Sequence, residues 1–233
     1  MARFDLALTR RWLLAAGIAG TVTALLPYSA RAGTDAAVCA ACLRGADGRY
    51  AVALLNAEGA IVARAPLPDR GHGIAASPDG RRIVAFARRP GRFAVSLDVA
   101  SGVAGTAFAA PGGRHFYGHG VYSPDGALLY APENDFDAGV GVIGVYDATA
   151  NFARVDEMPG GGIGPHEAVL LEGGAVLAVA VGGIATHPDS GRRKLNLPTM
   201  APALVYLDRR SGRLLERVEL PSRWHQLSLR HLV

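Results

Sequence analysis

The sequence predicts an all-β protein built from the blades of a β-propeller, and three observations lead to that prediction. Short segments of alternating apolar and polar residues fill the chain, and glycine, proline or aspartate bounds them as it bounds β-strands. A histidine motif recurs every 47 residues. In the first two copies an Asp-Gly pair, which favours tight hairpins, follows the histidine in step. Four strands in about 47 residues is the size of one WD-like propeller blade.

The N-terminal residues are expected to lie outside this fold. Thr9-Arg10-Arg11 precedes an apolar run from Leu13 to Leu26, and Ala30-Arg31-Ala32 offers small residues at the positions that a signal peptidase reads. We therefore expect a twin-arginine signal peptide over residues 1–32 and export to the periplasm. The apolar run is short for a bilayer span, so a permanent anchor is the weaker interpretation. The mature chain is expected to begin with a flexible segment over residues 33–48.

The two cysteines of the chain, Cys39 and Cys42, fall in that segment. An oxidising periplasm permits a disulfide between them, and the spacing also suits half of a metal site. No second pair completes a zinc ribbon, and Leu43 in place of histidine argues against haem attachment. We expect a local disulfide or inert thiols.

Charge and motifs argue against several function classes. The net charge of +4 is modest, and no basic stripe with interleaved aromatic residues occurs, so nucleic acid is not an expected partner. The glycine run Gly160-Gly161-Gly162 precedes a strand rather than a helix, and no nucleophile motif or Walker loop occurs. Hydrolase and nucleotide-binding functions therefore have no sequence support.

The repeats begin at regularly spaced histidines. Gly71-His72-Gly73-Ile74 leads to Ser77-Pro78-Asp79-Gly80, and Gly118-His119-Gly120-Val121 leads to Ser123-Pro124-Asp125-Gly126. A third copy runs from Pro165-His166-Glu167-Ala168 to Glu172-Gly173-Gly174, and a fourth begins at Trp224-His225-Gln226-Leu227. His225 follows His166 by 59 residues, so 12 extra residues form a polar loop around Thr186–Lys194.

Each repeat is expected to hold four strands. The first follows the histidine, the second follows the hairpin, and the third ends in an aspartate: Asp98, Asp147 or Asp208. Examples of these strands are Arg82–Phe86, Phe93–Leu97 and Val142–Tyr146.

The number of blades predicted is too small for a closed ring. Before His72 there are two strands, Arg49–Asn56 and Ala60–Pro66, and after His225 there is one. Residues 49–233 therefore hold three full blades between two partial ones. Because a propeller needs about 4–8 blades, we expect an incomplete open arc of a larger propeller, with a distorted four-bladed ring as the alternative.

Several motifs resemble those of the domain-of-unknown-function 1513 family, from about Tyr50 to the last residue. The resemblance implies a twin-arginine-exported, propeller-like protein associated with imelysin-type periplasmic iron-uptake proteins. It also implies that the C-terminal portion of the family is missing here. The motifs are Gly113-Arg114-His115-Phe116-Tyr117-Gly118-His119-Gly120, Pro132-Glu133-Asn134-Asp135, Gly162-Ile163-Gly164-Pro165-His166-Glu167, Thr186-His187-Pro188-Asp189-Ser190-Gly191 and His225-Gln226-Leu227-Ser228.

The repeated histidines His72, His119, His166 and His225 are expected on one face, near the mouth of the propeller channel. Imidazole binds zinc, copper and iron, so a ring of histidines can hold a metal ion, with iron or copper as the candidates. In the alternative interpretation each histidine hydrogen-bonds the aspartate that ends the third strand, as in WD-type repeats. The repeat period does not decide between the metal-binding and the structural interpretation.

Polar residues in the loops between second and third strands add candidates for ligand binding on the same face. They are Arg89, Glu133, Asn134, Asp135, His187 and Asp189. The expected function is a periplasmic propeller that binds a metal or a small ligand in connection with iron acquisition. The alternatives are a metal-dependent or redox enzyme that uses the histidine face, and a protein-interaction scaffold with structural histidines.

Overall fold

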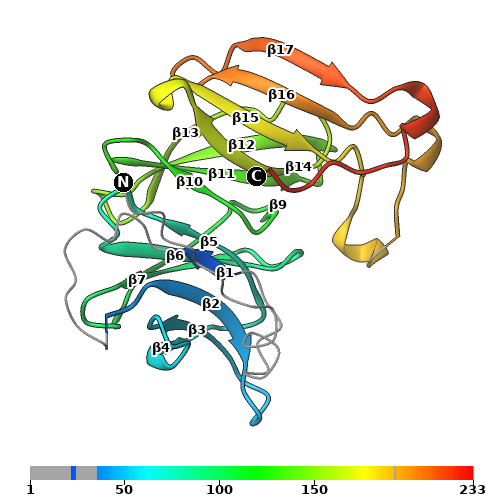
Figure 1. Ribbon diagram of the computed structural model, residues 1–233. Helices are drawn as coiled ribbons and strands as arrows, with labels where there is room; N and C mark the ends of the chain where they lie inside the picture. The colour runs from blue at the N-terminus through cyan, green and yellow to red at the C-terminus, as the bar shows by residue number, and fades with distance from the viewer. Residues whose placement is uncertain (1–21, 25–35, 192, 233) are drawn as a thin grey trace.

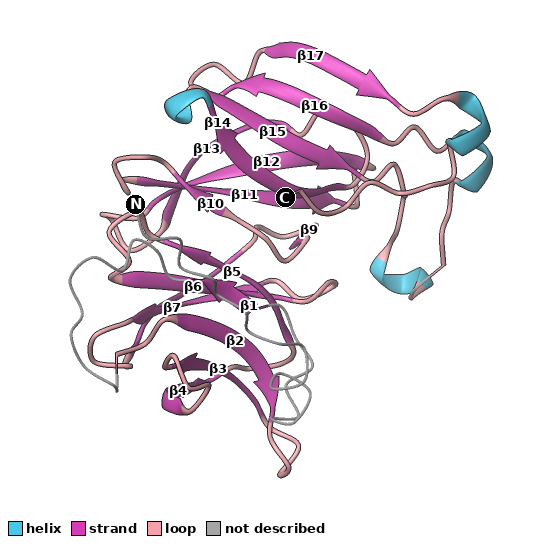
Figure 2. Ribbon diagram, viewed as in Figure 1, coloured by secondary structure: helices cyan, strands magenta, loops and turns pink. Residues whose placement is uncertain are grey.

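The computed structural model describes residues 22–24, 36–191 and 193–232. β-strands dominate this part of the chain, and its helices are four single 3-10 turns (Figure 2). These turns are Glu172–Gly174, Pro188–Ser190, Leu197–Thr199 and Ser222–Trp224. No helix in these ranges is both long and apolar enough to cross a membrane.

The strands form four antiparallel sheets, each built from consecutive strands. The first blade contains β1 (Val22–Ala24), β2 (Cys39–Arg44), β3 (Tyr50–Leu55) and β4 (Ile61–Pro66). The second contains β5 (Gly71–Ala76), β6 (Arg82–Ala87), β7 (Phe93–Asp98) and β8 (Ala104–Ala109). The third contains β9 (Arg114–Phe116), β10 (Val121–Tyr122), β11 (Leu128–Asp135), β12 (Val140–Asp147) and β13 (Ala153–Pro159). The fourth contains β14 (Pro165–Leu171), β15 (Val176–Val181), β16 (Ala203–Asp208) and β17 (Leu214–Glu219).

The blades lie side by side in chain order and form an open arc of a β-propeller. The first strands of successive blades contact one another, β1 with β5, β5 with β10 and β10 with β14, so these are the inner strands of the arc. Figure 1 shows the first and fourth blades at opposite ends of the row. The predicted fold class, all-β with propeller blades in an incomplete arc, is confirmed.

Three hydrophobic cores hold the arc together, one at each contact between neighbouring blades. Val52, Leu54, Ile83 and Leu97 belong to the core between the first and second blades. The second and third blades share a core around Phe86, Phe116 and Tyr146, and the third and fourth share one around Ile143, Leu177 and Val205. Middle strands such as β12, which is buried from Gly141 to Tyr146, are apolar because the two faces of their sheet contact the cores on either side.

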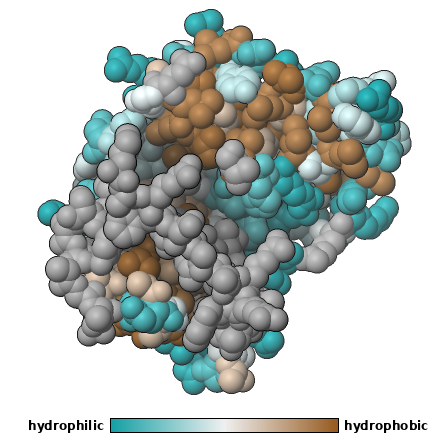
Figure 3. Space-filling model, in the orientation of Figure 1, coloured by the Kyte–Doolittle hydropathy of each residue, from teal (hydrophilic) through white to brown (hydrophobic). Residues whose placement is uncertain are grey.

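The outer strands are far more exposed. β17 has no fully buried residue, and Leu214, Leu215 and Val218 are exposed on it. Figure 3 shows apolar side chains gathered over the fourth blade, where these strands lie.

The expected hairpins form as the Asp-Gly pairs indicate. Asp79 accepts hydrogen bonds from the Ser77 hydroxyl at 2.7 Å and from the Arg81 amide at 3.0 Å, and Gly80 adopts a positive φ of 67°. Asp125 and Gly126 repeat this arrangement in the third blade. A positive φ is costly for residues with a side chain, which explains the glycines.

The structure corrects the expected start of the propeller. Cys39–Arg44 is strand β2, with Ala40 and Ala41 completely buried, so the prediction of a flexible segment over residues 33–48 is wrong there. The predicted signal peptide, residues 1–32, lies outside the described residues except for Val22–Ala24, which pair with β2 as β1. The first blade is therefore four-stranded rather than partial.

The structure also corrects the expected fourth repeat. No strand follows Glu219 in the described chain, and His225 comes directly after the 3-10 turn Ser222–Trp224. The 12 extra residues before it do fall where expected, in the long loop between β15 and β16.

Of the two alternatives expected for the cysteines, a local disulfide or inert thiols, the disulfide is wrong. Cys39 and Cys42 are free thiols. They stand three apart on strand β2, and successive side chains of a strand point to opposite faces, so the two sulfur atoms are directed away from each other. Cys42 is part of the core between the first two blades, and burial raises the pKa of its thiol to about 12.

Candidate histidine site

Three of the repeated histidines, His72, His119 and His166, stand at irregularities of inner strands. The register of β5 against β6 shifts between Gly71 and Ile74, around His72, and the register of β14 against β15 shifts at His166. In the third blade the inner strand is split into β9 and β10, and His119 lies in the break between them. Bulges bend a strand and re-aim its side chains, and they are frequent beside functional sites.

These irregularities bring three histidines from three different blades into contact. The ring centroids of His72 and His119 are 4.8 Å apart, those of His119 and His166 are 5.0 Å apart, and those of His72 and His166 are 5.9 Å apart. One ligand nitrogen of each ring lies within 4.8 Å of the other two. We call these three residues the histidine cluster.

Two glycines of the repeat make this close approach possible. The amide of Gly73 donates to the carbonyl of Gly118 at 2.8 Å, which joins the inner strands of the second and third blades. A β-carbon on Gly73 would lie 2.3 Å from that carbonyl oxygen and 2.8 Å from Nδ1 of His119. A β-carbon on Gly118 would lie 2.5 Å from Cδ2 of His72. The Gly-His-Gly pattern therefore serves to place the rings.

The histidine cluster is uncharged at neutral pH. Burial, together with the charges of neighbouring histidines, lowers the pKa of His72 to about 4, that of His119 to about 3 and that of His166 to about 2. A neutral imidazole keeps a lone pair available, which is the form that coordinates a metal ion.

His119 gives the clearest indication that the histidine cluster binds a ligand or a water molecule. Its Nε2 is buried and has no hydrogen-bond partner, whereas its Nδ1 lies 3.5 Å from Oε1 of Glu167. A buried polar atom without a partner costs free energy unless a ligand or water satisfies it.

A carboxylate and a fourth histidine border the cluster. His231 lies with its ring 5.2 Å from that of His119 and 5.1 Å from that of His166, and its Nδ1 is 3.3 Å from Oε2 of Glu167. His119, Glu167 and His231 again offer one ligand atom each within 4.8 Å of one another. The site therefore offers two overlapping sets of metal ligands. One consists of three imidazoles and the other of two imidazoles and a carboxylate, and His119 belongs to both.

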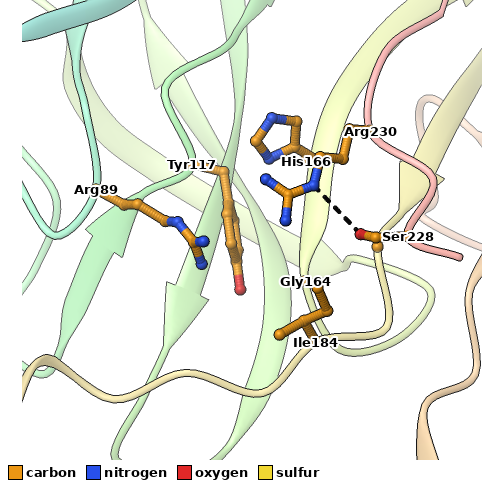
Figure 4. Close-up of a pocket in the computed structure, with 8 residues that line it drawn as sticks. Arg89, Tyr117, Gly164, His166, Ile184, Ser228 and Arg230 are labelled. Carbon is orange, nitrogen blue, oxygen red and sulfur yellow. Dashed lines mark hydrogen bonds between the residues drawn. The ribbon is translucent and has the colours of Figure 1, made fainter. Parts of the chain in front are cut away.

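A small cavity of about 10 Å³ opens beside His166 (Figure 4). Two arginines, Arg89 and Arg230, lie on either side of Tyr117 in it, and Nε of Arg230 donates to the Ser228 hydroxyl at 3.4 Å. The hydroxyl of Tyr117 is buried without a hydrogen-bond partner. The cavity is lined by Arg89, Tyr117, Gly164, His166, Gly182, Ile184, Ser228 and Arg230.

Among the predicted loop residues, Arg89 and His187 lie near this region. Arg89 also lines a second, larger pocket of about 140 Å³, which it shares with His115, Thr186 and His187. Asn134 supports the pocket wall, because its side-chain amide donates to the Thr186 carbonyl at 3.1 Å and lies 3.1 Å from Nε2 of His115.

Glu133 and Asp135 are placed elsewhere, in a buried ion-pair network within the third blade. Glu133 is completely buried, accepts a 2.5 Å hydrogen bond from the Tyr146 hydroxyl and lies 3.2 Å from Nη2 of Arg154. Asp135 lies 2.9 Å from Nη2 of Arg114, which also pairs with Glu157. The structure therefore pairs both predicted ligand carboxylates, Glu133 and Asp135, with arginines of the third blade and does not bring them to the histidine cluster.

His225 and Asp189 do not join the cluster either. Nδ1 of His225 lies 2.8 Å from the Ser222 carbonyl, and the prediction that it completes a ring of four histidines is wrong. Asp189 is on the 3-10 turn Pro188–Ser190, where its amide donates to Nδ1 of His187 and its side chain is 90% exposed.

The alternative interpretation of the histidines, as partners of the repeated aspartates, is also wrong for this structure. Asp98 accepts hydrogen bonds from Ser101, Asp147 from Thr149 and Asp208 from Ser211, all within the turn that follows the third strand. First and third strands of a blade run in the same direction, with the histidine near the start of one and the aspartate at the end of the other. A strand length of about 17–20 Å therefore separates them.

Four residues of the site had not been expected from the sequence: Glu167, His231, Tyr117 and Arg230. Glu167 follows His166 directly, so the repeat position itself was the available signal. His231 lies outside the repeat, and nothing in the spacing indicates that it reaches a histidine 112 residues earlier in the chain.

The fold and this site define a β-propeller protein with a histidine cluster on its inner strands. The chain belongs to the protein family DUF1513, a family of unknown function, whose match covers residues 65–233. The resemblance inferred from the motifs is thereby confirmed. None of the curated proteins matches this chain.

A solved structure of hydrazine synthase from Kuenenia stuttgartiensis is similar in fold, with a TM-score of 0.60 and 14% sequence identity. The match covers 78% of this chain and 46% of that one, so the chain spans about half the length of its structural relative. At this identity the likeness shows the fold alone, and one fold serves many unrelated functions.

Proposed function

We propose that this protein binds a divalent transition-metal ion at the histidine cluster. The observation that carries the proposal is the meeting of three neutral imidazoles from three blades, one of which, His119, has a buried Nε2 without a hydrogen-bond partner. Metal–imidazole bonds are about 2.0–2.1 Å long, so the rings turn slightly inward when the ion binds. Imidazole ligands suit zinc, copper, iron and nickel.

Two observations favour iron among these metals. The second donor set, His119, Glu167 and His231, contains two histidines and one carboxylate, a combination typical of non-haem iron(II) sites. The family resemblance connects such proteins with imelysin-type iron-uptake proteins in the periplasm. We therefore propose a periplasmic protein that binds iron, with copper as the next candidate, as part of iron acquisition.

The same donor set supports a second candidate function. A metal ion held by three protein ligands keeps positions open for a substrate, as catalytic sites do. The cavity beside His166 would then lie next to the reacting atoms. A metal-dependent or redox enzyme is therefore the alternative to a binding protein.

Metal analysis of the full chain purified from the periplasm tests the proposal. We expect about one equivalent of metal in the wild type, loss of it in His119→Ala and retention in His225→Ala, whose histidine lies outside the cluster. Titration of the metal-free protein with iron(II), copper(II) and zinc(II) then ranks the metals. Equal metal content in His119→Ala and the wild type, with both folded, overturns the proposal.

A further inference from the structure

We propose that a small carboxylate anion binds beside the histidine cluster, held by Arg89, Arg230 and Tyr117, and serves as a further ligand of the metal ion. This inference rests on the proposed metal site and names the class of small molecule that the site takes. Three features of the cavity beside His166 support it: its charge, its unpartnered hydrogen-bond donor and its room.

The charge of the cavity favours an anion. Its lining carries the guanidinium groups of Arg89 and Arg230 and, in the part of the chain that the structure describes, no carboxylate. A divalent ion on neutral imidazoles adds two more positive charges, of which Glu167 offsets one. A bound anion relieves this excess, and guanidinium groups bind carboxylates in bidentate fashion.

The Tyr117 hydroxyl supplies a directed donor. It is buried without a hydrogen-bond partner, and the Tyr117 residue is 3% exposed. A phenol hydroxyl donates hydrogen bonds, so this group can donate to an anion. Buried hydroxyls without a partner are rare in folded proteins, which indicates that a ligand or water completes this one.

The two pockets that Arg89 lines offer room of the right size. The cavity of about 10 Å³ beside His166 accepts one group about as large as a water molecule, such as a carboxylate oxygen. The neighbouring pocket of about 140 Å³, bounded by Thr186 and His187, leaves space for the body of a small organic acid. Cavities of roughly 150 Å³ hold a molecule such as benzene.

Cobalt(II) provides the test, because its visible absorption bands change when a ligand enters its coordination sphere. The full chain is loaded with cobalt(II), and the spectrum is followed as acetate is added. Three variants are compared with the wild type: Tyr117→Phe, Arg230→Gln and Arg223→Gln. The last is the matched control, since Arg223 stacks on Trp224 outside the cavity.

We expect acetate to change the wild-type and Arg223→Gln spectra with the same affinity, and to bind at least about tenfold more weakly to Tyr117→Phe and Arg230→Gln. The cobalt affinity of all four proteins should be unchanged. If cobalt binds but acetate leaves the spectrum unaltered, or acts equally on all variants, the anion site is refuted and the metal site stands. If cobalt does not bind to the wild type, both proposals fail together.

Discussion

His72 and His119, 47 residues apart in the sequence and on different blades, pack edge to face with their ring centroids 4.8 Å apart. The contact depends on the backbone beneath the rings, where the Gly73 amide donates to the Gly118 carbonyl. A repeat that supplies one blade per period thus also supplies one ring per blade to a shared site.

Replacing Gly118 by alanine should separate these two rings. The new β-carbon would lie 2.5 Å from Cδ2 and 2.9 Å from Cβ of His72, at a backbone φ of +97°. The matched control is Gly139→Ala, which has a similar φ of +70° but open space around the β-carbon. Both variants should lose about 1 kcal/mol to backbone strain. Gly118→Ala should in addition lose metal affinity, measured by calorimetric titration; equal metal affinity in the two variants would contradict the packing described.

Removing Glu133 should destabilise the third blade without affecting metal binding. Glu133→Ala leaves the buried side of Arg154 without its carboxylate, and breaking such a pair costs about 3–5 kcal/mol. Glu157→Ala removes a partly exposed partner of the same arginine and should cost about 1 kcal/mol. Urea unfolding measures both, and metal content should equal that of the wild type. Loss of metal from a folded Glu133→Ala variant would show that this carboxylate contributes to metal binding.

The metal-free protein should become less stable as the pH falls below about 6.5. Burial lowers the pKa of His119 to about 3 and that of His166 to about 2, from 6.5. Below pH 6.5 the unfolded chain therefore binds protons that the folded chain does not bind. As the pH falls, each such histidine lowers the free energy of unfolding by up to about 1.4 kcal/mol per pH unit.

The variant His166→Asn isolates this contribution, because asparagine does not titrate. Between pH 6.5 and 4 its free energy of unfolding should fall less steeply than that of the wild type. His225→Ala, which alters a histidine outside the cluster, should keep the wild-type slope. Identical slopes for all three proteins would mean that the histidine cluster is not buried in a neutral form.

The two cysteines should react with a thiol reagent at different rates. Cys42 is 5% exposed and its thiol pKa is raised to about 12, whereas Cys39 is half-buried. The thiolate is the reactive form, so Cys39 should be labelled first and Cys42 mainly on unfolding. Mass spectrometry of the labelled peptides follows both. Absence of any free thiol in the non-reduced protein would show that the disulfide exists after all.

Local pattern was sufficient to predict most strands. Arg82–Phe86 and Val142–Tyr146 were predicted because apolar runs bounded by glycine, proline or aspartate suit buried strands, and they lie within strands β6 and β12. Strand β2, Cys-Ala-Ala-Cys-Leu-Arg, was missed because it lacks the β-branched and aromatic residues that indicate strands.

The site was harder to predict because it depends on the direction of the strands and on contacts between residues far apart in the sequence. The repeat placed His72, His119 and His166 correctly on one face. The proposed pairing with Asp98 ignored the direction of the strands, which puts that aspartate at the far end of its blade. His231 reaches Glu167 across 64 residues, and sequence spacing contains no sign of such a contact.

The central claim is that the histidine cluster coordinates a metal ion, and anomalous scattering from crystals soaked in zinc(II) or cobalt(II) tests it most directly. We expect one strong anomalous peak within about 2.0–2.3 Å of the ring nitrogens of His72, His119 and His166, or of the donor atoms of His119, Glu167 and His231. Crystals of His119→Ala should lack it, since both donor sets share that residue. Fully soaked wild-type crystals with no peak between these rings would contradict the account.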